Sequence, residues 1–214
     1  MKKEFYSLVL SKIVIAAIDR EASAKGTSRS NLINSILAQH VHYETPEQRM
    51  QDIFSYLENM LCGDIFYPIA QPSDSIFSMR TSLDFKYNPN VRYSVELYRD
   101  AFPVLGKIKV SLRTQNHALI DGLDEFFTFW NTMERGAGLP RANITNGRYE
   151  RLLAVKGAEG ASLTNQEVSI IISDYIRALD GALKAYFYAD DVNGTIDKIC
   201  KSFDSYVASS SIIV

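Results

Sequence analysis

The sequence predicts an α+β protein in which a small N-terminal unit precedes a larger domain built on an antiparallel sheet. Three patterns predict it: a strand-like segment at residues 4–10, two helix-like segments at residues 11–41, and a period-two alternation at residues 76–113. The chain has 214 residues, of which 46% are hydrophobic, enough for one large or two small domains. We place the domain boundary after residue 43, so the domains are residues 1–43 and 44–214.

The first element is a short strand with two different faces. Successive side chains of a strand point to opposite sides. Such a strand, with no partner nearby in sequence, leaves its N–H and C=O groups unsatisfied. Pairing with the same strand of a second chain would make a two-stranded ribbon, which fits the DNA major groove. One face carries Tyr6, Leu8 and Leu10, and the other carries Phe5, Ser7 and Val9.

Two amphipathic helices follow this strand almost without a loop. Ser11 is a good N-cap for the first helix, and Gly26 is a good residue to end it. Ser28 can cap the second helix. Apolar residues recur at helical spacing in both segments: Val14, Ala17, Ile18 and Ala22 in the first, and Leu32, Ile33, Ile36, Leu37 and Val41 in the second.

From Tyr6 to Val41 this order and spacing resembles the ribbon-helix-helix family of DNA-binding repressors. The resemblance includes the strand–Ser11 junction, the Gly26 stop and the start of the second helix at residues 27–33. It implies a homodimer whose two strands pair. It also implies a dimer core made of Tyr6, Leu8, Leu10, Val14, Ile18, Leu32, Ile33 and Ile36.

The resemblance also implies which residues contact DNA. The base-facing side chains would be Phe5, Ser7 and Val9. This face departs from the family pattern, because it offers a single hydroxyl where base edges are read by hydrogen bonds. Binding would then depend on phosphate contacts and DNA shape, unless the ribbon serves only to dimerise. The residues that would contact phosphates are Lys2, Lys3, Thr27, Ser28, Arg29 and Ser30, the last four at a helix start that favours anions.

The remainder of the chain predicts a sheet covered by helices. Thr45, Pro46 and Gln48 start a helix, and residues 68–75 read as a loop. Residues 76–113 form a three-stranded antiparallel meander with one apolar and one polar face. A weak hairpin is expected around Asn146-Gly147, and a turn at Asn193-Gly194. The expected helices are residues 46–62, 116–135, 164–189 and 195–208.

The charge is unevenly distributed. Residues 1–42 contain six Lys or Arg and three Asp or Glu, a net +3, so the formal charge of −2 for the chain leaves −5 for the rest. A basic arm on an acidic body suits a nucleic-acid-binding head. The polar sheet face is either a second nucleic-acid surface or an ordinary solvated face, and its cations are Arg80, Arg92, Lys107, Lys109 and Arg113.

The sequence offers no pattern for catalysis, a cofactor or a metal. A phosphate-binding glycine loop and a nucleophile elbow are missing. His40 and His42 share no helix face, so we expect no metal site with Cys62. Two distant cysteines indicate free thiols in a reducing cytoplasm. No apolar run has the roughly 18–20 residues that span a bilayer.

These patterns favour a non-enzymatic, cytoplasmic, dimeric transcriptional regulator that binds double-stranded DNA and resembles a repressor. Its C-terminal domain would serve oligomerisation, partner binding or sensing. The first alternative is an accessory protein that uses the ribbon only to dimerise and binds RNA or a protein. The second is an antitoxin, although the large, well-patterned C-terminal domain differs from the short tails usual in antitoxins.

Overall fold

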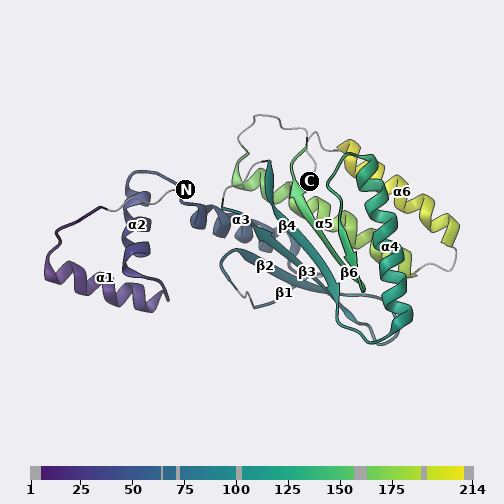
Figure 1. The fold of residues 1–214 in the computed structure, drawn as a ribbon, viewed down its shortest axis with the longest axis horizontal. Coiled ribbons are helices and arrows are strands. Elements are labelled where there is room, and N and C mark those ends of the chain that lie inside the picture. Colours follow the sequence, from purple (N-terminus) through teal and green to yellow (C-terminus); the bar gives the residue numbers. More distant parts are fainter. Residues whose placement is uncertain are drawn as a thin grey trace. The chain divides into compact units, whose positions relative to one another are not determined.

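A computed structural model of the protein describes residues 6–63, 65–70, 73–99, 103–156, 163–188 and 192–209. The chain divides into two compact units, Met1–Arg49 (the head) and Met50–Val214 (the body), with the division a few residues after the one expected from the sequence. Figure 1 shows their elements. The helices are α1 (Lys12–Ala24), α2 (Arg29–His40), α3 (Pro46–Leu61), α4 (His117–Gly136), α5 (Asn165–Tyr188) and α6 (Val192–Ser209). The strands are β1 (Tyr67–Pro68), β2 (Ile76–Ser82), β3 (Asn90–Leu97), β4 (Val104–Leu112), β5 (Asn143–Thr145) and β6 (Arg148–Ala154).

The two helices of the head begin and end as the sequence predicts. The Ser11 and Ser28 hydroxyls accept hydrogen bonds from the third backbone N–H of α1 and α2, at 3.4 and 3.2 Å. Gly26 has a φ of 62° and follows the last turn of α1. The amide of Gly26 donates to the carbonyl of Ser23, and that of Thr27 donates to Ala22. This pair of bonds is a Schellman motif, which ends α1 sharply.

The predicted N-terminal strand is not formed within the single chain. Residues 6–10 have no regular secondary structure, and all of them are exposed. The first strand that the structure describes is β1, in a stretch where we expected a loop to begin. Within the part of the chain that the structure describes, residues 6–10 pair with no other strand.

The body contains a six-stranded antiparallel sheet rather than a three-stranded meander. Its strand order is β1-β2-β3-β4-β6-β5. The hairpin of β5 and β6 turns at Asn146 and Gly147, whose φ angles are 54° and 70°, as a type I′ turn requires. It joins the meander because β6 pairs with β4 from Val104 to Ser111. At the opposite edge, β1 pairs with β2.

All four helices of the body contribute to a single core on one face of this sheet. The strands supply Met79, Tyr93 and Ile108 among others, and each of these three side chains is fully buried. The helices supply side chains such as Leu57 and Phe126. The opposite face is polar, as the alternation of the sequence predicts.

A glycine in β4 allows two central strands of the sheet to approach closely. The register between β4 and β6 shifts between Val104 and Gly106. A Cβ atom at Gly106 would lie 1.9 Å from the backbone oxygen of Glu96 on β3. Only glycine therefore allows β3 and β4 to approach so closely here.

The helices of the body lie close to their predicted positions, with one correction. Thr45 and Gln48 form a capping box at α3, with bonds of 3.0 and 3.2 Å, and Thr164 and Glu167 do the same at α5. The expected turn at Asn193-Gly194 lies inside α6, which starts earlier than predicted. None of the helices in the described part of the chain is long and apolar enough to cross a membrane.

Candidate nucleic-acid interface

The head exposes most of the apolar side chains that we assigned to a dimer core. Of those eight residues only Leu32 is buried, and Ile18 and Ile33 are half-buried. Tyr6 is 86% exposed and Leu8 51%. The other exposed members are Leu10, Val14 and Ile36.

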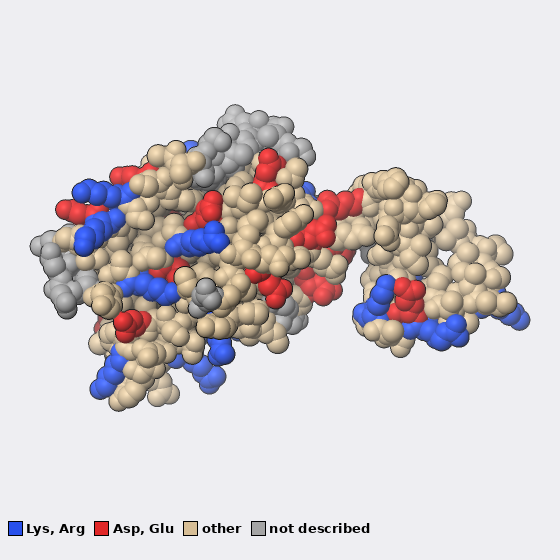
Figure 2. All heavy atoms as spheres, turned by 180° about the vertical axis from the view of Figure 1, so that it is seen from behind, with Lys and Arg blue, Asp and Glu red and all other residues tan. Residues whose placement is uncertain are grey.

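The head on its own has almost no core. Among its residues 6–49, the buried side chains are Ala22, Leu32, Ala38 and Thr45. In Figure 2 the charged side chains of this unit gather along one side, and most of its visible surface carries no charge. A unit this small with so little buried apolar surface is marginally stable alone. The apolar positions that it leaves exposed include most of those that we assigned to a dimer core.

The face predicted to meet DNA is only partly described. Ser7 and Val9 are exposed on the extended segment. The other base-facing residue, Phe5, lies outside the described residues, as do the predicted phosphate ligands Lys2 and Lys3.

The start of α2 has free backbone donors but an engaged cation. Amides in the first turn of a helix have no acceptor within the helix, which makes the amides of Arg29 and Ser30 donors for an anion. The Arg29 guanidinium, however, donates two hydrogen bonds of 2.6 Å to the Asp19 carboxylate. The hydrogen bond from Arg29 lowers the pKa of Asp19. A phosphate at this position would have to compete with Asp19 for Arg29.

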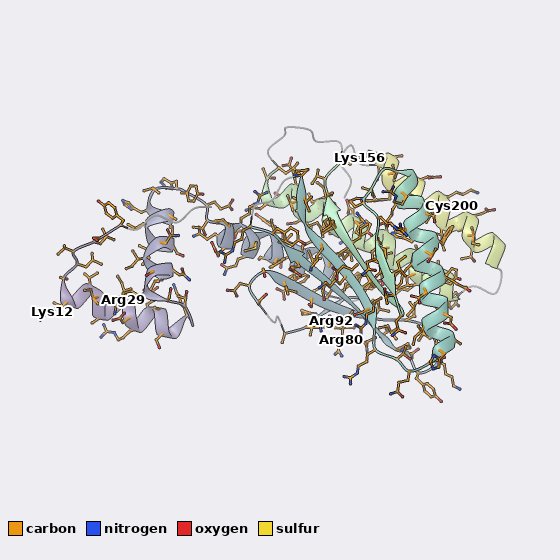
Figure 3. All side chains as sticks on the ribbon, in the orientation of Figure 1. Lys12, Arg29, Arg80, Arg92, Lys156 and Cys200 are labelled. Atoms are coloured by element: carbon orange, nitrogen blue, oxygen red, sulfur yellow. The ribbon has the colours of Figure 1, made fainter. Side chains whose placement is uncertain are left out.

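The open face of the sheet carries a transverse row of arginines. Pairing places Arg80 of β2 opposite Arg92 of β3, and Arg92 opposite Ser111 of β4. Ser111 is in turn opposite Arg148 of β6. Figure 3 shows Arg80 and Arg92 side by side. The row ends with Tyr67 on β1, opposite Arg80, and with Thr145 on β5, opposite Arg148.

The two lysines predicted for this basic surface are instead neutralised. Lys107 Nζ lies 3.3 Å from a carboxylate oxygen of Glu96 and 3.7 Å from one of Glu150. Lys109 Nζ lies 3.9 and 3.3 Å from the same two carboxylates. Desolvation lowers the pKa of Lys107, but the hydrogen bond to Glu96 and the charge of Glu150 outweigh it, so the pKa is raised. Two cations and two anions thus cancel on this part of the face.

The arginines differ, because Arg80, Arg92, Arg113 and Arg148 are all exposed and have no ion pair within the described ranges. Arg92 donates one hydrogen bond of 3.1 Å to the Ser78 hydroxyl. The sequence predicted Arg80, Arg92 and Arg113 for this surface but missed Arg148. Its partner strand β4 lies far away in sequence, so only the β4–β6 pairing shows that it shares their face.

A second polar cluster, which the sequence analysis also missed, lies inside the body. The Glu134 carboxylate on α4 accepts hydrogen bonds from Tyr149 and Tyr175, both at 2.6 Å, and from Trp130 at 3.0 Å. Arg151 Nε lies 3.0 Å from Glu134 Oε1, and its guanidinium stacks over the Tyr175 ring. Burial, and the negative charge of Glu134, raise the pKa of Tyr149.

This cluster joins α4, β6 and α5 in the core. Glu134, Arg151, Tyr149 and Tyr175 are each at most 1% exposed, so none of them meets a dissolved ligand. The sequence held one signal for it. Glu134 lies four residues after Trp130, on the apolar side of α4, where a charged residue requires a buried partner.

The histidines near the end of α2 do not combine with other metal-ligating groups. His42 has a φ of 55° and follows the last turn of α2, where its amide donates to Gln39. Among the residues that the structure describes, no three His, Cys, Asp or Glu side chains are placed to hold a metal ion. Cys62 and Cys200 are both free thiols.

Among the described residues, the exposed apolar side chains of the head and the arginine row of the sheet are candidate binding surfaces. No protein-family model, no curated protein and no solved structure matches this chain.

Proposed function

We propose that the protein is a dimeric, DNA-binding transcriptional regulator whose head is a ribbon-helix-helix unit. One observation carries this proposal. The head forms both helices, both serine caps and the turn between them, yet exposes most of the residues that a ribbon dimer would bury. The helices, caps and turn, which need one chain, are formed. The strand pairing at residues 6–10, which would need a second chain, is not formed.

The extended segment at residues 6–10 supports the same dimer. Its backbone groups lie in an exposed segment without regular structure. Pairing with the same segment of a second chain would satisfy them in an antiparallel ladder. The alternation would then place Leu8 and Leu10 against the helices of both chains, with Val9 facing outward.

DNA binding by this dimer would rest on phosphate contacts more than on base reading. On the groove-facing side of residues 6–10, Ser7 offers one hydroxyl and Val9 offers no hydrogen-bonding group. The helix starts of the two chains each present free amides near Arg29 and Ser30. The net charge of +3 on residues 1–42 doubles in a dimer and adds a general attraction to DNA.

One observation favours a second candidate function. Asp19 holds Arg29 by two short hydrogen bonds, which weakens the cation best placed for a phosphate. The alternative is an accessory protein that uses the ribbon only to dimerise and binds RNA or another protein. Both candidates predict a dimer, and they differ in whether the head binds duplex DNA.

The test uses the full chain and exploits the alternation of residues 8–10. Leu8→Asp/Leu10→Asp places charges in the proposed dimer core, whereas Val9→Asp places one on the groove face of the same segment. Sedimentation equilibrium measures association, and fluorescence anisotropy measures binding to mixed-sequence duplex DNA at low salt. We expect the double variant to be monomeric and to lose DNA binding. Val9→Asp should stay dimeric and lose at least tenfold in affinity, because its carboxylate would enter the groove and be repelled by the negative charge of the DNA.

Other outcomes decide between the candidates. A double variant that still dimerises rules out the ribbon. A dimeric wild-type chain without affinity for duplex DNA rules out the regulator and leaves the accessory protein. Equal effects of Val9→Asp and the double variant on association would show that residues 8–10 are not paired as a strand.

A further inference from the structure

We propose that Arg80, Arg92 and Arg148 form a second DNA site, on the open sheet face of the body, that binds the phosphate backbone. The proposal rests on the proposed function, in that duplex DNA is the ligand. It concerns a different unit of the chain and a different set of residues.

The row is continuous across the sheet. Arg80, Arg92 and Arg148 belong to β2, β3 and β6, with Ser111 of β4 between the second and the third. Since neighbouring strands lie about 4.8 Å apart, three strand spacings give a row about 14 Å long. A DNA strand carries one phosphate per about 3.4 Å of helix axis, so this length covers several consecutive phosphates. Arg113, directly after β4, adds a further exposed cation.

The cations of the row have no ion-pair partner among the residues that the structure describes. Like charges directly opposite each other on neighbouring strands destabilise a sheet, and Arg80 and Arg92 are such a pair. On the same face, Lys107 and Lys109 are each matched by Glu96 and Glu150. The lysines of this face are thus paired with carboxylates, and the arginines are available to an external anion.

The chemistry of the row favours phosphate over a protein partner. The planar guanidinium of arginine binds phosphate oxygens through two parallel N–H donors. The hydroxyl of Ser111 lies in the same row and can donate to a further oxygen, whereas that of Thr145 donates to Asn143 Oδ1 at 3.4 Å. A protein partner would need an apolar centre, and between β2 and β5 this row contains only arginine, serine and threonine.

A second backbone site would compensate for a head that reads bases poorly. Two sites on one chain bind the same duplex with an effective concentration set by the connection between them, so affinity rises without any new base contact. Specificity would then come from the head, and part of the affinity from the body.

The matched variants are Arg80→Gln/Arg92→Gln and Lys107→Gln/Lys109→Gln in the full chain. Both pairs remove two positive charges from the same sheet face, so they change the overall field equally. Affinity for mixed-sequence duplex DNA is measured as a function of salt. Each lost phosphate contact lowers the slope of log K against log salt by about 0.9. We therefore expect the arginine pair to lower the slope by about two and the affinity at least tenfold, and the lysine pair to change the slope little.

The remaining outcomes overturn the proposal in distinguishable ways. Equal effects of the two pairs would mean a general field rather than a site. Wild-type binding to DNA that the arginine pair leaves unchanged would reject this site and keep the regulator. If the wild type binds poly-glutamate and not DNA, and the arginine pair abolishes that binding, the row docks an acidic protein and the proposed function fails as well. Arg148→Gln, a single variant at the far end of the row, should lower the slope by about one.

Discussion

The head and the body differ in how much of their apolar surface they bury. The body buries most of its apolar side chains in one core, and this core also encloses Glu134 and Arg151 with almost no exposed surface. The head forms two well-capped helices and leaves Leu8, Leu10 and Val14 exposed. One unit has a core of its own, and the other exposes the side chains that the proposed dimer would bury.

This difference gives the two units different kinds of stability. The body should unfold with a free energy that is independent of protein concentration. The head, if it folds fully only as a dimer, should gain stability with concentration, because association draws the equilibrium toward the folded form. Dilution should therefore change the effect of a substitution in the head on stability, and should not change the effect of one in the body.

The largest expected effect comes from opening the buried cluster of the body. Glu134→Ala removes the partner of Arg151 and the acceptor of two tyrosine hydroxyls. Breaking a buried ion pair in this way costs about 3–5 kcal/mol. We expect this loss in the free energy of unfolding, measured by urea denaturation and circular dichroism, with no change in dimerisation.

Glu150→Ala is the control for that prediction. Glu150 pairs with Lys107 and Lys109 on the exposed sheet face, where such pairs contribute about 0–1 kcal/mol. Similar losses in the two variants would show that the cluster adds no more stability than a surface ion pair. A loss of dimerisation in Glu134→Ala would contradict the independence of the two units.

Local signals of the sequence predicted most of the elements. Caps such as Ser11, Ser28 and Thr164 marked the helix starts because their hydroxyls bond to the amide of a residue three positions later. The alternation in residues 76–113 predicted three strands and the polar face, since burial of one face imposes a period of two. Each of these signals acts over a few residues.

The features that the sequence did not predict depend on distant contacts. β6 carries charged residues on both faces, Arg148 outside and Arg151 inside, so its alternation is obscured and its pairing with β4 could not be seen. β1 has two residues, one of them Pro68, and gives no strand pattern. The ion pairs of Lys107 and Lys109 with Glu150 likewise depend on the position of β6 beside β4.

Substitution of two glycines in the body should change the free energy of unfolding by intermediate amounts and in opposite directions. Gly106→Ala forces a Cβ to within 1.9 Å of a backbone oxygen, and such overpacking costs about 1–3 kcal/mol. Gly181 lies within α5 with nothing within 4 Å of its added Cβ, so Gly181→Ala should stabilise by about 0.5–1 kcal/mol. Urea denaturation measures both. A neutral Gly106→Ala would mean that β3 and β4 separate easily at this point.

The smallest expected effects come from one cap in each unit, and they test the comparison most directly. Thr164→Ala removes the hydroxyl that accepts from the Glu167 amide in the capping box of α5, and Ser28→Ala removes the cap of α2. Each loss should cost about 1 kcal/mol. The Thr164 loss should be the same at every protein concentration. The Ser28 loss should appear as weaker dimerisation, about fivefold in the dissociation constant for each kcal/mol, because the helix that it caps supplies Leu32, Ile33 and Ile36 to the proposed dimer core. Sedimentation equilibrium over a dilution series measures this. If Ser28→Ala leaves association unchanged, α2 does not contribute to the dimer, and the exposed apolar residues of the head need a different partner.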